Sequence, residues 1–327
     1  MKKPILVAAF LFCCLQRVWG GVDLAPQESL VAAKQHADLT NDQPVPFQLD
    51  VDFVAQFNVP DRGHLTLKWE AKDRWWRKVT VDEFEQIEVK NGEWHYTVRN
   101  ASFTPLAIGN LISLLGFGDD SKDFIAKKEK QRNENGVAMS CIQVERKGYA
   151  ESSRNVCVSK ASNDILVDEW KEPPDEQRRE QYSDYFDFGV HRYPRKLERL
   201  ENGSQVVAAE VVSLISAPFD DSLLTPPKGA IARRECDGLK HATAIKTPEV
   251  PYPRSASSSG LMGDTTVAMT VLTDGSVTDI HLLGRATRSM DDATLQALKQ
   301  WKFKPAMCGS EPVVTDITVV VSFRLSN

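Results

Sequence analysis

The sequence lacks the patterns that indicate a metal site, a redox pair or a nucleic-acid surface. No CxxC pair occurs, and the six histidines stand singly, without HxH or HxxxH spacing. Because a metal site needs three or four such ligands brought together, we expect no metal and no cofactor. The formal net charge of −5 at pH 7, with scattered lysines and arginines, leaves no basic face for phosphate neutralisation. Nucleic acid is therefore not an expected partner.

The sequence also has no apolar run long enough to cross a bilayer as a helix. The run from Ile5 to Leu15 has 11 residues, about half of the ~20 that a spanning helix needs. Two lysines precede this run and two glycines follow it, which is the pattern of a cleavable secretory signal peptide over residues 1–20. We therefore expect a periplasmic protein, with an uncleaved inner-membrane anchor as the alternative.

No catalytic constellation can be assembled from the spacing of the residues. The acidic pairs Asp184/Asp187 and Asp220/Asp221 have no second group fixed opposite them, so we interpret them as solvated turn acids. The aromatic and basic stretch at residues 69–78 could stack bases or sugars, but neighbouring acids cancel its charge and favour strand packing. The sequence therefore favours a binding protein over an enzyme, with a hydrolase of unrecognised site as a weaker third hypothesis.

Alternating apolar and polar residues begin after a polar lead segment at residues 21–44. The stretches "FQLDVDFVAQFNV", "HLTLKWEAKDRWWRKVTV" and "EFEQIEVKNGEWHYTVRN" alternate at the period of β-strands, as in Leu65, Leu67 and Trp69. The Asn-Gly pair in "KNGEW" is typical of a tight hairpin. Residues 45–100 are therefore predicted to form an antiparallel meander of four or five strands.

The period becomes helical between residues 104 and 132. "LAIGNLISLL" predicts an apolar helix, and "DDSKDFIAKKEKQR" a charged helix after it. Strand-like runs resume from "GVAMSCIQVER" to "SQVVAAEVVSLI", and "FDDSLLTPPKGA" predicts an exit loop. One curved antiparallel sheet, resembling half a barrel and covered by helices, accounts for residues 45–236.

A smaller domain is predicted at residues 251–327, after a non-periodic linker at 237–250. "TVAMTVL" and "SVTDIHLL" flank an Asp-Gly turn, with Val277 out of phase with Ile280, which predicts a β-bulge. Residues 289–301 then repeat at helical spacing, with Ser289 as the expected N-cap, and a last strand alternates over 313–325. Three strands and a helix follow, so the whole chain is predicted to be α+β.

The order of these signals resembles the TonB C-terminal domain family over residues 248–325. "PEVPYP", the hairpin with its central "DG", the helix ending "LKQWKFKPA", "EPV" and "ITVVVSFRL" fall in the order of that family. The resemblance implies a module that adds a short strand, the TonB box of an outer-membrane transporter, to its sheet edge. It implies that the last strand is the docking edge and that "IKTPEV" flanks it. The implied partner-binding residues are Val314, Asp316, Thr318, Val320, Ser322, Thr247 and Glu249.

Residues 45–236 resemble, less specifically, the half-open β-barrels of lipoprotein carriers such as LolA. That resemblance implies a concave face that binds an acyl chain or an apolar protein segment. The main hypothesis is a periplasmic binding protein of a TonB-like system, whose partner is a TonB-dependent outer-membrane transporter or another envelope protein. The alternative is a carrier whose β-rich domain holds a lipid or a lipoprotein.

Removal of the signal peptide leaves an even number of cysteines in a compartment where disulfides persist. Cys141 and Cys157 lie in two strand-like runs joined by a connection of hairpin size, so we expect them to pair. Cys236 is then left with Cys308, and their bond would hold the linker against the C-terminal sheet. Each domain is thus expected to contain its own disulfide.

Overall fold

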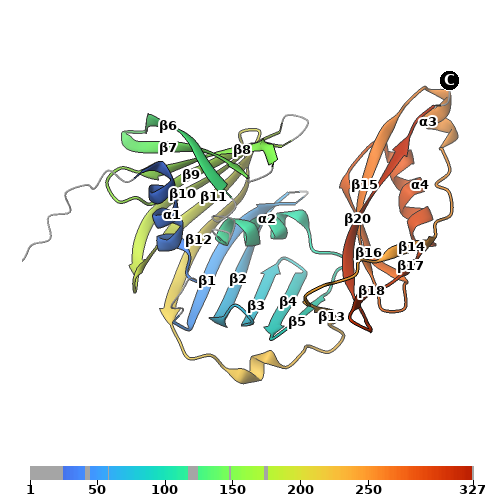
Figure 1. Cartoon of the computed structure of the whole chain (residues 1–327), viewed down its shortest axis with the longest axis horizontal. Helices are drawn as coiled ribbons and strands as arrows, with labels where there is room; N and C mark the ends of the chain where they lie inside the picture. The colour runs from blue at the N-terminus through green and yellow to red at the C-terminus, as the bar shows by residue number, and fades with distance from the viewer. Residues whose placement is uncertain are drawn as a thin grey trace, which may run out of the picture.

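The computed structural model describes residues 25–40, 45–57, 59–116, 124–146, 149–172 and 176–325. A large curved sheet and a smaller C-terminal unit lie side by side (Figure 1). Thirteen strands of the described residues form the large antiparallel sheet, in the order β13-β5-β4-β3-β2-β1-β12-β11-β10-β9-β8-β7-β6. The end strands β6 and β13 do not pair with each other, so the described sheet is open. The predicted half-barrel architecture is confirmed.

The strands of this sheet follow one another mainly through short turns. Their bounds are β1 (Phe47–Gln56), β2 (Pro60–Ala71), β3 (Arg74–Val81), β4 (Phe84–Asn91), β5 (Trp94–Arg99), β6 (Phe124–Glu134), β7 (Val137–Arg146), β8 (Tyr149–Ser159), β9 (Ile165–Glu172), β10 (Glu176–Phe188), β11 (His191–Glu201), β12 (Ser204–Ser216) and β13 (Ile231–Arg234). Strands β1 to β5 are the predicted meander. Gly92 takes a φ of +59° in the two-residue turn between β4 and β5, where residues with a Cβ are strained.

Two helices lie on the concave face of the large sheet. The predicted apolar helix is α2 (Leu106–Leu115), which packs on β1, β11 and β12 through the fully buried Ile108, Leu111 and Leu114. Helix α1 (Pro26–Ala37) was not predicted, because half of its residues are polar and it lies in the stretch interpreted as a polar lead segment. Its three buried residues share one face at helical spacing, and they are Leu30, Ala33 and Ala37.

The predicted charged helix after α2 is wrong. Residues 119–123 lie outside the described residues, and the remainder of that stretch forms the first part of β6. Strand β6 pairs with β7 along its length, through a turn in which Asn135 and Gly136 both have positive φ. Pairing with β7 in this hairpin, together with contacts from Gln27 of α1 to Ala126 and from Glu169 of β9 to Arg132, overrides the helix propensity of a Lys- and Glu-rich stretch. The exposed charges of β6 also discourage another strand from adding to this edge of the sheet.

The C-terminal unit contains the predicted three-stranded sheet, in the order β16-β15-β20, with α4 packed on one face. Two small strand pairs, β14–β17 and β18–β19, complete it in the described residues. The bounds are β14 (Thr243–Lys246), α3 (Arg254–Ser258), β15 (Gly263–Val271), β16 (Val277–Gly284), α4 (Arg288–Leu298), β17 (Lys302–Lys304), β18 (Ala306–Cys308), β19 (Glu311–Val313) and β20 (Thr315–Phe323).

Three local features of this unit refine the sequence predictions. The predicted bulge in β16 is confirmed, since the register with β15 shifts and Asp279 takes a φ of +52°. The N-cap of α4 is Thr287 and not Ser289, because the Thr287 hydroxyl accepts a hydrogen bond from the Met290 amide. The predicted final strand is interrupted at Val314, which separates β19 from β20.

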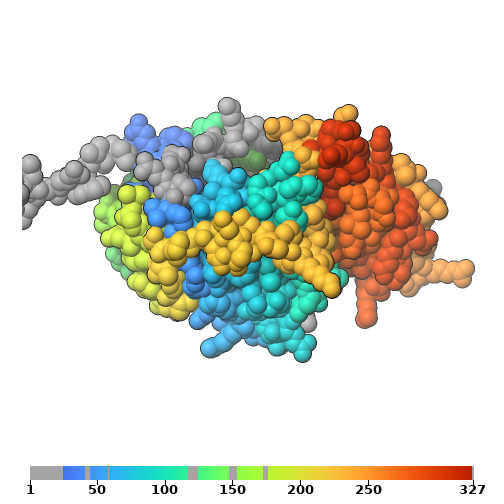
Figure 2. All heavy atoms as spheres, turned by 90° about the horizontal axis from the view of Figure 1, so that it is seen from below, coloured from blue at the N-terminus to red at the C-terminus, as the bar shows by residue number. Residues whose placement is uncertain are grey.

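The chain crosses from one unit to the other through a long connection. After β12, the segment with the short 3-10 helix η2 (Asp221–Leu224) runs across the ends of β3 and β4, as the gold band in Figure 2 shows. Strand β13 then joins the edge of β5, and β14 pairs with β17. The stretch at 237–250 is therefore not wholly irregular, and the domain boundary placed there stays a prediction. The expected signal peptide lies outside the described residues.

No helix within the described residues combines the length and the apolar character needed to cross a membrane.

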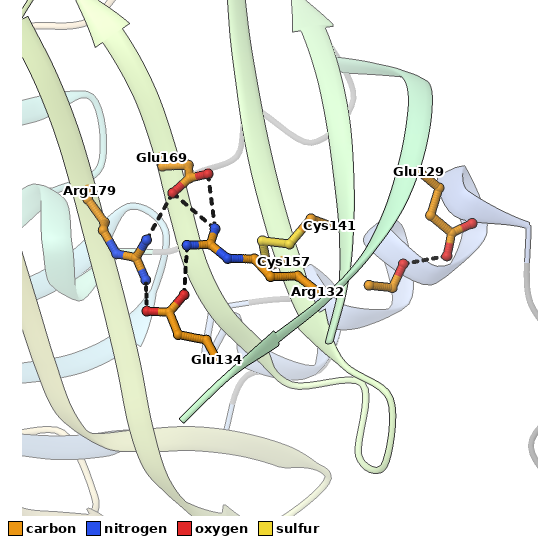
Figure 3. Close-up of a disulfide and its surroundings, with 8 residues drawn as sticks. Glu129, Arg132, Glu134, Cys141, Cys157, Glu169 and Arg179 are labelled. Carbon is orange, nitrogen blue, oxygen red and sulfur yellow. Dashed lines mark hydrogen bonds and ion pairs between the residues drawn. A yellow bond between two sulfur atoms is a disulfide. The ribbon is translucent and has the colours of Figure 1, made fainter. Parts of the chain in front are cut away.

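Both predicted disulfide pairings are confirmed. Cys141 and Cys157 are directly opposite each other in β7 and β8. Arg132 extends from β6 past this bond to Glu169, within an ion-pair network that includes Glu134 and Arg179 (Figure 3). Cys157 is fully buried and packs in a small apolar cluster with Met139 and Val167.

The expectation that each domain contains its own disulfide is wrong for the second bond, which joins two different units. Cys236 follows β13, the end strand of the large sheet, by two residues, whereas Cys308 ends β18 of the C-terminal unit. The bond therefore fastens the large sheet directly to the C-terminal unit. This position was not predictable, because nothing in the local sequence indicated that residues 231–234 join the edge of β5.

Candidate functional sites

Strand β20, which the sequence indicated as the docking strand, lies at the edge of its sheet. Among the described strands it pairs along its length with β15 alone. Ile317 and Val319 face the core under α4, so the alternate residues face the opposite side. Thr318, Val320 and Ser322 are exposed there, Val320 to 58%. An edge strand with exposed backbone groups is a surface to which an extended peptide can add.

The first part of the expected docking edge is already in contact with the large unit. Val314 forms an isolated parallel β-bridge with Arg233 of β13. The Arg233 guanidinium also donates to both carboxylate oxygens of Asp316, at 2.9 and 3.0 Å, and Thr270 donates to the same carboxylate at 2.6 Å. Burial raises the pKa of Asp316, but the hydrogen bonds from Arg233 and Thr270 outweigh it and lower the pKa overall. Val314 and Asp316 therefore bind within the chain itself.

The expected flanking segment lies on the other side of the C-terminal unit. Thr247 and Glu249 are exposed, and between them the Pro248 carbonyl accepts a hydrogen bond from the Trp301 indole at 3.2 Å. Trp301 packs against the core under α4, so this segment follows the helix-covered side of the sheet. The exposed residues of β20 point to the opposite face. The role of all seven residues in partner binding stays a prediction.

Further contacts join the two units beside Arg233. Arg99, at the end of β5, forms an ion pair with Asp279 in the β16 bulge, and both side chains are nearly buried. The Phe103 ring stacks on the His281 imidazole, with centroids 4.7 Å apart and planes 13° from parallel. Arg234 contacts Glu311 at 2.5 Å. The large unit thus contacts one end of the three-stranded sheet in the C-terminal unit, on the side that α4 does not cover.

A second candidate site is an apolar cavity of about 370 Å³ on the concave face of the large sheet. Alternate residues of β1 and β2 form its floor, and the ends of α1 and α2 form its walls. Its apolar lining includes Leu39, Phe47, Leu49, Leu65, Leu67, Trp69, Ile112, Leu115 and Tyr193. Cavities of this size and polarity accept apolar ligands. The alternation of Leu65, Leu67 and Trp69 in the sequence indicated this face, but not its enclosure by two helices.

Arg77 lines this cavity and is held by a buried carboxylate. Its Nη2 atom lies 2.6 Å from Oε2 of Glu88, whose side chain is 9% exposed, and Nε2 of His95 lies 3.3 Å from Oε1. Burial raises the pKa of Glu88, but the Arg77 charge and the polar contacts with His95 and Arg77 outweigh it. The pKa is therefore lowered to about 2. Glu88 is ionised at neutral pH and fixes Arg77 at the cavity wall.

The other residues considered as chemical candidates do not converge. Asp184 and Asp187 are exposed and face Arg195 and Arg192, whereas Asp220 caps η2. Within the described part of the chain, no group of three or more His, Cys, Asp or Glu side chains could hold a metal ion. Of the aromatic stretch at 69–78, Trp69 stacks on Phe47 inside the cavity, at a centroid distance of 6.3 Å.

Comparison with known proteins confirms the resemblance of the C-terminal unit to the TonB family. Residues 248–325 match the family described as Gram-negative bacterial TonB protein C-terminal. Protein TonB of Pseudomonas aeruginosa is 32% identical over 75 residues, which are 23% of this chain and 22% of that protein. Protein TonB of Vibrio cholerae is also 32% identical over 75 residues, 31% of its length. This chain therefore spans less than a third of the length of these relatives.

Solved structures also align with parts of this chain. A LolA superfamily protein from Nitrosomonas europaea has 11% sequence identity and a TM-score of 0.43, covering 62% of this chain and 98% of its own.

Proposed function

We propose that this is a periplasmic binding protein of a TonB-like system, exported by the signal peptide at residues 1–20. Its C-terminal unit docks an extended strand of a TonB-dependent outer-membrane transporter, or of another envelope protein, along β20. The observation that carries the proposal is the exposed edge formed by residues 318–322, in a unit whose sequence matches the TonB C-terminal family. Backbone hydrogen bonds along that edge supply affinity, and the alternate side chains supply selectivity.

Replacing Val320 with proline should weaken binding of a synthetic TonB-box peptide at least about tenfold, since proline removes a backbone donor and bends the strand. Val320→Ala, which keeps the backbone N–H, should bind within about twofold of the wild type. Isothermal titration measures both affinities, and circular dichroism checks the fold.

A peptide series tests the same docking mode without altering the protein. Strand addition requires that N-methylation of one alternate set of peptide amides abolishes binding, while methylation of the other set is tolerated. Equal effects of the two sets, or unchanged binding to a folded Val320→Pro variant, would exclude β20 as the docking edge.

The cavity favours a second function, that of a carrier for an acyl chain of a lipid or lipoprotein. Leu67→Glu places a charge among apolar lining residues, so the purified variant should lose bound lipid that the wild type retains. Native mass spectrometry measures retention. The control is Val212→Glu, because Val212 is 54% exposed in β12 and does not line the cavity. A wild-type protein without bound lipid, and unable to take up a fatty acid, would contradict the carrier function.

A further inference from the structure

The loop between β5 and α2 connects the C-terminal unit to the wall of the cavity. It begins at Arg99, whose guanidinium pairs with Asp279, and it contains Phe103, which stacks on His281. Six residues, 100–105, separate Arg99 from the first residue of α2. At the other end of that helix, Ile112 and Leu115 line the cavity. One short segment thus contacts the C-terminal unit and leads into the helix that encloses the ligand space.

The loop is also held in place by hydrogen bonds between its side chains and strand β4 of the large sheet. The Asn100 carboxamide binds the Glu85 amide at 2.9 Å, and Thr104 donates to the buried Gln86 at 2.5 Å. Helix α2 has a matching tie at its C-terminal end, where the Tyr193 hydroxyl donates to the Leu115 carbonyl at 2.7 Å. The loop and α2 therefore belong to one continuous set of hydrogen-bonded and packed groups, which is the kind of network that carries energetic coupling between two sites.

The anchor on the C-terminal unit lies in the same network that holds the docking strand. Thr270 donates to Asp316 of β20 and lies 3.4 Å from Asp279, the partner of Arg99. A strand that binds along β20 would therefore contact the same sheet in which Asp279 holds the loop through Arg99. The contact chain from β20 to the cavity is continuous and consists of packed or hydrogen-bonded groups.

We infer that the β5–α2 loop couples the C-terminal unit to the cavity, so that loosening of the Arg99–Asp279 and Phe103–His281 contacts loosens α2 and releases the ligand. Docking of a partner on β20 is the event that would trigger release. The release step rests on the proposed carrier function, whereas the coupling between the C-terminal unit and α2 does not depend on it.

Hydrogen exchange measured by mass spectrometry tests the coupling directly. In the full-length Asp279→Asn and His281→Ala variants, amides of residues 106–115 should exchange about fivefold faster or more than in the wild type. Asn is chosen at position 279 because it tolerates the positive φ of this residue. The control is Asp264→Asn, which breaks the exposed ion pair with Arg324 at the other end of the same sheet and should leave α2 unchanged. Unchanged exchange of α2 in both test variants would overturn the inference.

Dissociation of parinaric acid, a fluorescent fatty acid, tests the release step in the same proteins. Its dissociation rate should rise about fivefold in Asp279→Asn and His281→Ala, and stay at the wild-type value in Asp264→Asn. Faster exchange of α2 with an unchanged dissociation rate would overturn the release step. Failure of the wild type to bind parinaric acid would contradict the carrier function, while the exchange result would still decide the coupling.

Discussion

Replacing Arg77 with alanine is expected to lower the free energy of unfolding by about 3–5 kcal/mol at pH 7, because it leaves the buried Glu88 carboxylate without its cationic partner. The matched control is Lys78→Ala on the same strand. Lys78 pairs with Glu85 at 2.8 Å, but both side chains are more than a third exposed, so its loss should cost less than about 1 kcal/mol. Urea denaturation followed by circular dichroism measures both changes.

The effect of Arg77→Ala should depend on pH in a defined direction. In the wild type the folded-state pKa of Glu88, about 2, lies below its ordinary value of 4.5. The carboxylate therefore contributes stability that is fully present above about pH 4.5 and is lost as the pH falls through about 2. That contribution is about 3 kcal/mol at neutral pH.

Without Arg77, burial becomes the main influence on Glu88 and raises its pKa, so the carboxyl group takes up a proton more readily as the pH falls. The difference between variant and wild type should therefore be smaller at pH 4 than at pH 7. A penalty that is the same at both pH values, or no larger than that of Lys78→Ala, would show that Glu88 is not held as an ion by Arg77.

Replacing Cys236 and Cys308 with alanine is expected to lower the free energy of unfolding by about 4 kcal/mol, since the bond closes a loop with a sequence separation of 72. The same change at Cys141 and Cys157, which are separated by 16 residues, should cost about 3 kcal/mol in the same chain-entropy account. Urea denaturation without reductant compares the two double variants.

The two disulfides should also differ in where their loss acts. Because the Cys236–Cys308 bond joins the two units, its removal should let the C-terminal unit unfold at a lower urea concentration than the large sheet, in a separate transition. Loss of the Cys141–Cys157 bond should leave a single transition shifted as a whole. Two transitions after loss of Cys141–Cys157, or a single transition after loss of Cys236–Cys308, would contradict the conclusion that the Cys236–Cys308 bond holds the two units together.

Much of the candidate docking strand could be predicted from local sequence. The alternation of Ile317, Val319 and Val321 with Thr318, Val320 and Ser322 fixed which side chains face the core, because successive residues of a strand point to opposite faces. The engagement of Asp316 could not be predicted in this way. Its partner Arg233 is 83 residues away, in a strand too short to give a periodic signal.

The sequence by itself determined those elements whose signal lies within a few neighbouring residues. These are the β1–β5 meander, α2, the three-stranded C-terminal sheet with its helix, and the cysteine pairs. Only the tertiary structure decided that the Lys-rich segment after Phe124 is a strand, that residues 231–234 extend the large sheet, and that α1 and α2 enclose a cavity. The second and third depend on contacts between residues distant in the chain, and the first depends on the β6–β7 hairpin and its contacts with α1 and β9. Such contacts outweigh local propensities of about 0.5 kcal/mol per residue. Periodicity reports which face of an element is apolar, but packing decides what covers it.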